Sequence, residues 1–186
     1  MLMNLLKKVA LGLGAVVVLL TLVAYVLPRK VHVERTQTIT AAPEAVFAQV
    51  NTLRNWEQWS PWHKLDPHMK LSYTGPAAGP GASYAWTSAQ RNVGTGLCTI
   101  THSQPFSRID TDLKFGEEAG KTTSYYLFEE APEGTKVTWG MDLDMGLNPL
   151  GRYMGLLMDG MIGADFEKGL HNLQQVVGSQ PVTVAP

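Results

Sequence analysis

The first 27 residues contain the longest uninterrupted apolar segment of the chain. Residues 9–27 carry no charged side chain, and twelve of these 19 residues are Val or Leu. A helix over this segment would be about 28 Å long at 1.5 Å per residue, close to the hydrocarbon thickness of a bilayer. Pro28 ends the pattern, and Arg29 returns the chain to polar sequence. The pattern predicts a transmembrane anchor over residues 9–27, preceded by a basic N-terminal tail of residues 1–8.

A cleaved signal peptide is the main alternative for this segment. Signal peptides have a shorter apolar region and small residues at the cleavage site, whereas this segment continues into Tyr25-Val26-Leu27-Pro28. We therefore expect an uncleaved, single-pass membrane anchor. Basic residues are almost balanced across it, and the short basic tail in front of the apolar run favours a cytoplasmic N-terminus with the domain on the extracytoplasmic side.

Beyond the anchor, two hydrophobic periods divide the chain. A period of two predicts strands near residues 31–40, 69–73, 84–86, 94–103, 107–115, 121–130 and 135–145. Two short helices are expected after Pro43, and the period changes to 3.6 from Leu150 to Val177, which predicts one long helix. An antiparallel sheet with one apolar face needs a cover, and this helix is the only segment long enough. We expect one α+β domain over residues 31–178, with a curved antiparallel sheet of about seven strands around the helix, and a flexible tail at 179–186.

Charge and cysteine content exclude several function classes. The chain has 15 basic and 16 acidic residues and a formal net charge of -1, without the basic surface that nucleic-acid binding requires. Its single cysteine, Cys98, excludes an internal disulfide and a zinc site built on cysteine pairs. His63, Asp66 and His68 lie in a proline-containing loop without a helical i, i+4 pair, so we expect no metal site. Gly94-Thr95-Gly96 lacks the following glycine and helix of a dinucleotide fingerprint, and we expect no cofactor.

Several short motifs run through the predicted domain. They are Trp56-Glu57-Gln58-Trp59-Ser60-Pro61-Trp62, Leu65-Asp66-Pro67, Tyr73-Thr74-Gly75-Pro76, Gly79-Pro80-Gly81, Tyr84-Ala85-Trp86, Gly94-Thr95-Gly96 and Asp165-Phe166-Glu167-Lys168-Gly169-Leu170. With the order of the predicted elements, these motifs resemble the START-like (SRPBCC) superfamily, and more narrowly the bacterial polyketide cyclase/dehydrase-like group. The resemblance implies a helix-grip fold with a cavity between the concave face of the sheet and the long helix. Members bind lipids, sterols, polyketides or other apolar molecules, and some catalyse cyclisation or dehydration.

Aromatic residues and methionines are the side chains that we expect at such a cavity. Methionine adapts to irregular shapes and is common on surfaces that accept varied ligands. We expect the cavity lining to include Tyr73, Tyr84, Trp86, Trp139, Met141, Met154, Met158 and Met161. A fully packed core is the alternative for the same residues. The five glycines between residues 151 and 169 leave the same choice, since they allow either space for a ligand or close packing of the helix on the sheet.

Three tryptophans, Trp56, Trp59 and Trp62, follow the first predicted helices. A spacing of three places Trp56 and Trp59 near one helix face. We expect the three indoles at the mouth of the cavity. The alternative is that they fasten the short helices to the sheet.

Together these features predict a membrane-anchored binding module for a hydrophobic small molecule or lipid, with no catalytic residue. The second hypothesis is an enzyme of the cyclase or dehydratase kind, in which Tyr73, Tyr125, His102 or Asp159 would point into the cavity beside an acid–base partner. A third hypothesis is a protein-interaction or stress module with a collapsed cavity, which would expose an apolar patch.

Overall fold

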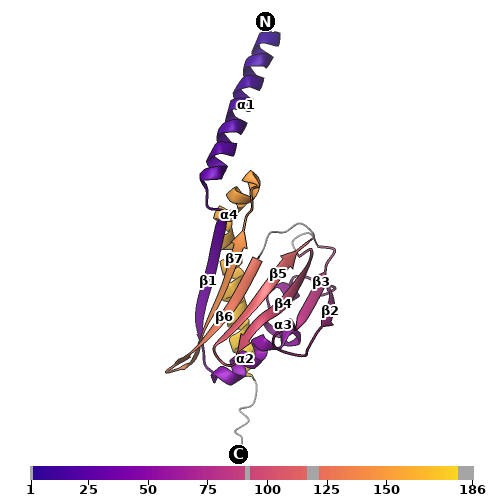
Figure 1. Ribbon diagram of the computed structural model, residues 1–186, viewed down its shortest axis with the longest axis vertical. Coiled ribbons are helices and arrows are strands. Elements are labelled where there is room, and N and C mark those ends of the chain that lie inside the picture. The colour runs from indigo at the N-terminus through magenta and orange to yellow at the C-terminus, as the bar shows by residue number, and fades with distance from the viewer. Residues whose placement is uncertain (1, 91–92, 117–121, 180–186) are drawn as a thin grey trace, which may run out of the picture.

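A computed structural model describes residues 2–90, 93–116 and 122–179 of the chain (Figure 1). The helices are α1 (Leu2–Val26), α2 (Pro43–Asn51), α3 (Trp56–Trp59) and α4 (Pro149–Gly178), with short 3-10 turns η1 (Leu53–Asn55) and η2 (Trp62–Lys64). The strands are β1 (Lys30–Ile39), β2 (Lys70–Thr74), β3 (Ser83–Thr87), β4 (Thr95–Gln104), β5 (Arg108–Phe115), β6 (Thr122–Ala131) and β7 (Gly134–Asp144). Apart from Ser179, the tail expected at residues 179–186 lies outside the described residues.

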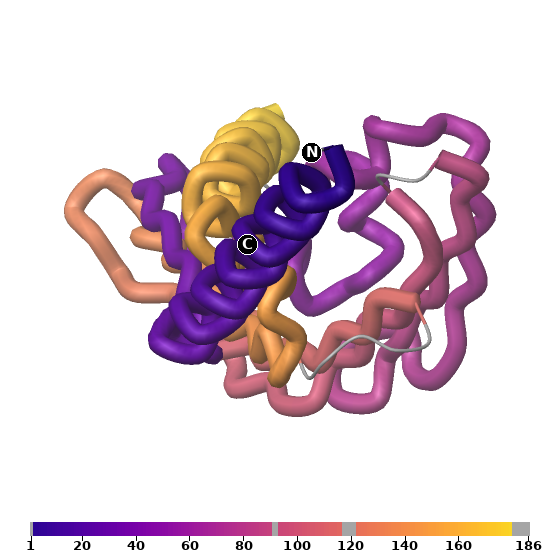
Figure 2. The backbone as a smooth tube through the Cα atoms, turned by 90° about the horizontal axis from the view of Figure 1, so that it is seen from above, coloured from indigo at the N-terminus to yellow at the C-terminus, as the bar shows by residue number. Residues whose placement is uncertain are grey.

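The seven strands form one antiparallel sheet in the order β1-β7-β6-β5-β4-β3-β2. Viewed from above, the sheet is strongly curved (Figure 2). Helix α4 packs mainly against β1 at one end of this curve, and the segment from α2 to η2 covers the other strands. This arrangement confirms the predicted α+β helix-grip fold with about seven strands and a long C-terminal helix.

Helix α4 begins where the sequence predicts because Asn148 caps it and Pro149 occupies its first turn. The Asn148 side chain accepts a hydrogen bond from the Leu150 amide at 3.0 Å, which satisfies one of the free amides at a helix N-terminus. Two of its glycines then meet side chains of the sheet. A Cβ added at Gly163 would overlap the Arg35 guanidinium, and one at Gly169 would lie 2.6 Å from the Trp139 ring. Close packing on the sheet therefore explains these two glycines.

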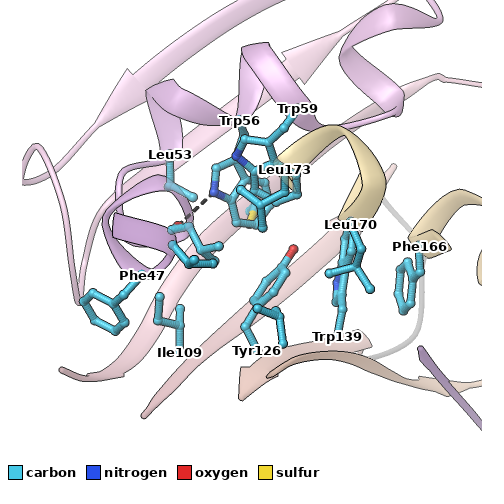
Figure 3. Packing of buried hydrophobic residues seen from close by; sticks show 14 of the residues in the cluster. Phe47, Leu53, Trp56, Trp59, Ile109, Tyr126, Trp139, Phe166, Leu170 and Leu173 are labelled. Atoms are coloured by element: carbon cyan, nitrogen blue, oxygen red, sulfur yellow. Dashed lines mark hydrogen bonds between the residues drawn. The ribbon is translucent and has the colours of Figure 1, made fainter. Parts of the chain in front are cut away.

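The core lies between the short helices, α4 and the concave face of the sheet (Figure 3). Aromatic rings dominate it: the Trp139 ring stacks on Phe166 of α4 at 4.1 Å between centroids and on Tyr126 of β6 at 5.0 Å. The Trp59 ring meets Trp139 edge-on at 5.7 Å. Such contacts add about 0.5–1.5 kcal/mol each to the burial of the rings. They fix the short segment α3 against the sheet.

Helix α1 projects from the domain at the end where β1 begins (Figure 1). Its length and mean hydropathy of 2.6 suit a membrane span, although a signal sequence has the same features, and only 6% of its most apolar window is buried against the rest of the protein. The junction with the domain is nevertheless ordered by Arg152 of α4. This side chain, only 8% exposed, donates hydrogen bonds to the carbonyls of Tyr25 at 2.9 Å and Leu27 at 3.2 Å. Carbonyls at a helix C-terminus lack partners within the helix, so Arg152 caps α1.

Candidate functional site

A cavity of about 140 Å³ lies between the sheet and the short helices. Its lining consists of Trp56, Trp62, His63, Met69, Tyr84, Trp86, Val93, Thr111, Leu113, Phe115, Ser124, Tyr126, Trp139 and Met141. An engineered apolar cavity of about 150 Å³ binds benzene or xenon. The volume of this cavity therefore matches a single ring or the end of a longer apolar chain.

The alternation of side chains along the strands produces the lining. On β5 and β6 the inward side chains Thr111, Leu113, Ser124 and Tyr126 are at most 8% exposed, while their neighbours point to the convex face. Phe115, at the end of β5, is 41% exposed and is the most exposed residue of the lining. Among the described residues, the lining therefore reaches the surface at Phe115, and we take this point as the opening of the cavity.

This opening lies at the end of the sheet from which α1 departs. β1 starts there with Lys30, which pairs with Asp144 at the end of β7. Leu113, close to the end of β5, is joined through Thr122 to Leu143 of β7. The end of β5 and the start of β1 thus share one end of the sheet, as Figure 1 shows.

Six of the predicted cavity residues are brought together by this geometry. Trp86, Tyr84, Trp139 and Met141 line the cavity from the sheet. Trp56 and Trp62 line it from the short segments above.

Trp59, expected at the mouth, lies behind the lining instead. Its ring is fully buried, and its indole nitrogen donates to the Gln49 carbonyl of α2 at 3.4 Å. Trp56 makes a similar bond to the Val50 carbonyl at 2.8 Å. Both indoles therefore fasten α3 to α2, and Trp56 contributes a face to the cavity as well.

Tyr73 and the three methionines of α4 lie outside the lining. Tyr73 contacts Tyr84 on the concave side, but its hydroxyl leaves the cavity and donates to a Glu57 carboxylate oxygen at 2.5 Å. Met154 and Met161 are 42% and 57% exposed on the outer side of α4, and Met158 is half-buried at the core edge. The helix turns its glycine face to the sheet, so the methionine face points away.

Two polar side chains that the sequence analysis did not select line the cavity. They are His63 of η2 and Tyr126 of β6. The two ring nitrogens of His63 and the hydroxyl of Tyr126 have no hydrogen-bond partner among the described residues. Burial lowers the pKa of His63, against the opposing effect of Glu57, and raises the pKa of Tyr126 well above its usual value. Both groups are therefore uncharged at neutral pH.

The hydroxyls of Ser124 and Thr111, which also belong to the lining, are satisfied within the protein. The Ser124 hydroxyl donates to the Gly140 carbonyl at 2.8 Å and accepts from the Trp139 indole nitrogen at 3.1 Å. The Thr111 hydroxyl donates to the Ser124 carbonyl at 3.4 Å. Among the described residues, the lining contains no Asp, Glu, Lys or Arg side chain, and there is no cluster suited to a metal ion. The site can therefore hold a neutral, mainly apolar molecule.

Comparison with known proteins agrees with this geometry. Residues 30–178 match the family described as polyketide cyclase / dehydrase and lipid transport. The chain belongs to this family. No curated protein matches the sequence significantly.

Solved structures show the same fold at low sequence identity. Protein SA2116 from Staphylococcus aureus superposes with a TM-score of 0.61 at 13% identity, covering 81% of this chain and 94% of that one. A protein from Rhizobium leguminosarum gives a TM-score of 0.59 at 18% identity, covering 81% and 96%. The di-domain ARO/CYC StfQ from the steffimycin biosynthetic pathway gives 0.61 at 12% identity, covering 80% of this chain and 51% of that one.

In this member of the polyketide cyclase / dehydrase and lipid transport family, the four acid–base candidates lie outside the cavity. Tyr125 points to the convex face of the sheet and donates to Glu34. His102 borders a shallow polar hollow on that same face. Asp159 of α4 forms an ion pair with Arg35 at 2.9 Å, and Tyr73 bonds Glu57 as described above. None of the four therefore contacts a molecule held in the cavity.

Proposed function

We propose that the protein binds an apolar small molecule or lipid in the cavity between its sheet and short helices while α1 holds the domain at a membrane. The observation that carries this proposal is a cavity whose described lining is uncharged and consists chiefly of aromatic and methionine side chains. Phe115, the most exposed residue of this lining, ends β5 at the end of the sheet from which α1 departs. Apolar area removed from water contributes about 25 cal/mol per Å². A ligand that leaves a bilayer would enter such a cavity without first crossing water.

The surface around the α1–α4 junction supports a position beside a bilayer. The Tyr153 hydroxyl of α4 donates to the Leu20 carbonyl at 2.7 Å, six residues before the end of α1. At 1.5 Å per residue, Leu20 would lie about 9 Å inside the end of the span. The first turns of α4 would therefore reach the level of the lipid headgroups.

These first turns of α4 present an apolar surface that the domain does not cover. The exposed side chains are Leu150, Met154, Leu157 and Met161, which follow the helix at i, i+4, i+7 and i+11 and are 42–70% exposed. We call them the outer stripe of α4. An apolar helix face of this kind lies stably in the interface of a bilayer. The same bilayer that holds α1 would then cover the outer stripe.

Ligand binding is tested with the full chain in lipid nanodiscs. Mass spectrometry of extracts from the purified protein should recover a bound apolar molecule, and a fluorescent fatty acid should bind saturably above the background of empty nanodiscs. The variant Leu113→Trp adds a large ring at the cavity mouth and should reduce saturable binding at least tenfold. Lys114→Trp places the same ring on the opposite face of β5 and should bind like the wild type. Absence of both a bound molecule and saturable binding would refute the proposal.

Membrane attachment is tested by extraction and by a topology reporter. We expect the protein to stay in the membrane pellet after alkaline carbonate washing, and alkaline phosphatase fused after residue 186 to be active. Release of the protein into the supernatant would contradict anchoring. An inactive fusion on a retained protein would place the domain on the cytoplasmic side.

A further inference from the structure

The cavity contains two buried polar groups that find no hydrogen-bond partner in the described part of the chain. Tyr126 is 1% exposed, and its hydroxyl and both ring nitrogens of His63 lack hydrogen-bond partners among the described residues. Buried polar groups are nearly always hydrogen-bonded, because an unpaired one loses the bonds that it makes to water. The two groups therefore indicate something about what the cavity accepts.

The two groups reach the cavity from opposite walls. Tyr126 rises from β6 toward the short helices, as Figure 3 shows, and His63 belongs to η2 on the covering side. Aromatic rings connect them: His63 lies 5.5 Å from Tyr84, Tyr84 lies 6.0 Å from Trp56, and Trp56 lies 5.7 Å from Tyr126, all between ring centroids. Both walls of this part of the cavity thus carry one unpaired polar group within an aromatic surface.

The chemistry of these groups selects uncharged oxygen functions. A tyrosine hydroxyl can donate one hydrogen bond and accept others, and a neutral imidazole offers one donor and one acceptor. His63 stays neutral because burial lowers its pKa. The part of the lining that the structure describes has no Lys or Arg to hold a carboxylate and no carboxylate to hold an amine, so a charged ligand group would lie uncompensated against it.

We propose that the ligand of this cavity is an uncharged apolar molecule that carries a hydroxyl or carbonyl oxygen, and that this oxygen hydrogen-bonds to Tyr126, His63 or both. The inference rests on the proposed ligand-binding function. It narrows the class of ligand from any apolar molecule to an apolar molecule with one polar end. A hydroxyl can pair with either group as donor or acceptor. A pure hydrocarbon would leave both groups unpaired and would bind more weakly.

The test compares two probes that differ by one hydroxyl. Binding of 4-fluorophenol and of fluorobenzene is measured by fluorine NMR with the full chain in nanodiscs, and the partition of each probe into empty nanodiscs is subtracted. Both probes have a single ring, which suits the cavity volume. We expect 4-fluorophenol to bind about tenfold more tightly than fluorobenzene, since a site with buried polar groups discriminates against a partner that leaves them unpaired.

Matched variants identify the groups responsible. Tyr126→Phe should weaken 4-fluorophenol binding about fivefold or more and leave fluorobenzene binding unchanged, and His63→Phe should act in the same direction if both groups bind the oxygen. Tyr125→Phe removes a hydroxyl from the residue before Tyr126, on the convex face of the sheet. This variant should bind both probes as the wild type does. Thermal unfolding of each variant shows that it is folded.

The outcomes separate this inference from the proposed function. Equal affinities of the two probes for the wild type, or an unchanged preference in both the Tyr126→Phe and the His63→Phe variants, would overturn the polar-ended ligand and leave apolar binding intact. Failure of both probes to bind would overturn the two proposals together.

Discussion

At the scale of single residues, His63 links pH to stability. In the folded protein, burial lowers the pKa of His63 below its ordinary value of 6.5. Just below pH 6.5, His63 is therefore protonated more readily in the unfolded chain than in the folded one. The free energy of unfolding should therefore be fully retained above pH 6.5 and should decrease as the pH falls through the lowered pKa.

The measurement is the unfolding midpoint of the full chain in nanodiscs at a series of pH values from neutral to weakly acidic. His63→Gln, which has no titrating ring, should flatten the dependence below pH 6.5. His171→Gln, at an exposed position of α4, is the control and should leave it unchanged. An identical slope in wild type and His63→Gln would contradict the assignment.

Two glycines of α4 make opposite predictions for the same substitution. Gly163 is buried, and a Cβ there would overlap the Arg35 guanidinium, which bonds Asp159 and Glu167. Gly163→Ala should therefore destabilise the domain by about 1–3 kcal/mol through overpacking.

Gly160 provides the matched control, because nothing lies within 4 Å of a Cβ added there. Gly160→Ala should stabilise the domain by up to about 1 kcal/mol through helix propensity. Denaturant unfolding of both variants measures the difference. A stabilising Gly163→Ala would show that α4 can move away from β1 at little cost.

At the scale of whole elements, α4 explains where sequence reasoning succeeded and where it did not. The period of 3.6 predicts the helix correctly, because both its halves are amphipathic. It does not show that the apolar face is buried in only one half of the helix. Phe166, Leu170 and Leu173 in the second half are buried, while Met154 and Met161 in the first half are exposed. The buried residues of the first half are Arg152, Gly155 and Gly163, so no apolar side chain marks the buried face there. The pattern therefore assigns Met154 and Met161 to the cavity although they belong to the outer stripe.

The strands gave a better prediction of the site because a period of two fixes the face of each residue. Tyr84, Trp86, Trp139 and Met141 follow from alternation alone. Tyr126 was missed because β6 has tyrosines at both 125 and 126, so that residue type could not tell which one faces inward. Counting in steps of two from Phe128 through Tyr126 would have indicated the inner face. His63 lies on a short turn, where no period exists.

The outer stripe of α4 is predicted to contact lipid. An environment-sensitive fluorophore is attached to the new cysteine of the Leu157→Cys variant, with the full chain in nanodiscs. Cys98 should stay unlabelled because burial raises its pKa to about 12. We expect blue-shifted emission that is quenched by spin-labelled lipid. Glu133→Cys, an exposed position in the β6–β7 turn, should give red-shifted emission without quenching.

The lipid quencher separates a bilayer from a protein partner. Blue-shifted emission at Leu157→Cys that spin-labelled lipid does not quench would mean that protein covers the outer stripe, as the interaction-module hypothesis requires. Red-shifted emission would mean that the stripe faces water.

At the scale of the whole molecule, function depends on how the domain is held relative to α1, because the cavity opens at that end. Arginine side chains contribute to fixing the junction. Arg152 caps the carbonyls at the end of α1, and Arg29 forms a two-pronged ion pair with Asp144 at 2.7 Å. This pair lowers the pKa of Asp144 to about 2, so it persists until the pH falls well below 3.8.

Arg152→Gln should loosen this junction without unfolding the domain. The shorter side chain cannot reach the carbonyls of both Tyr25 and Leu27, and the end of α1 would fray because its carbonyls lose their cap. Trypsin cuts after Arg29 and Lys30, so in nanodiscs the variant should be cleaved at this junction about tenfold faster than the wild type. Arg54→Gln removes an arginine that lies over the Tyr73 ring, far from α1 in the sequence, and should keep the wild-type rate. If Arg152→Gln is cleaved no faster, the domain is held in place by the bilayer contact of the outer stripe, and combining Arg152→Gln with Leu157→Asp should then release it.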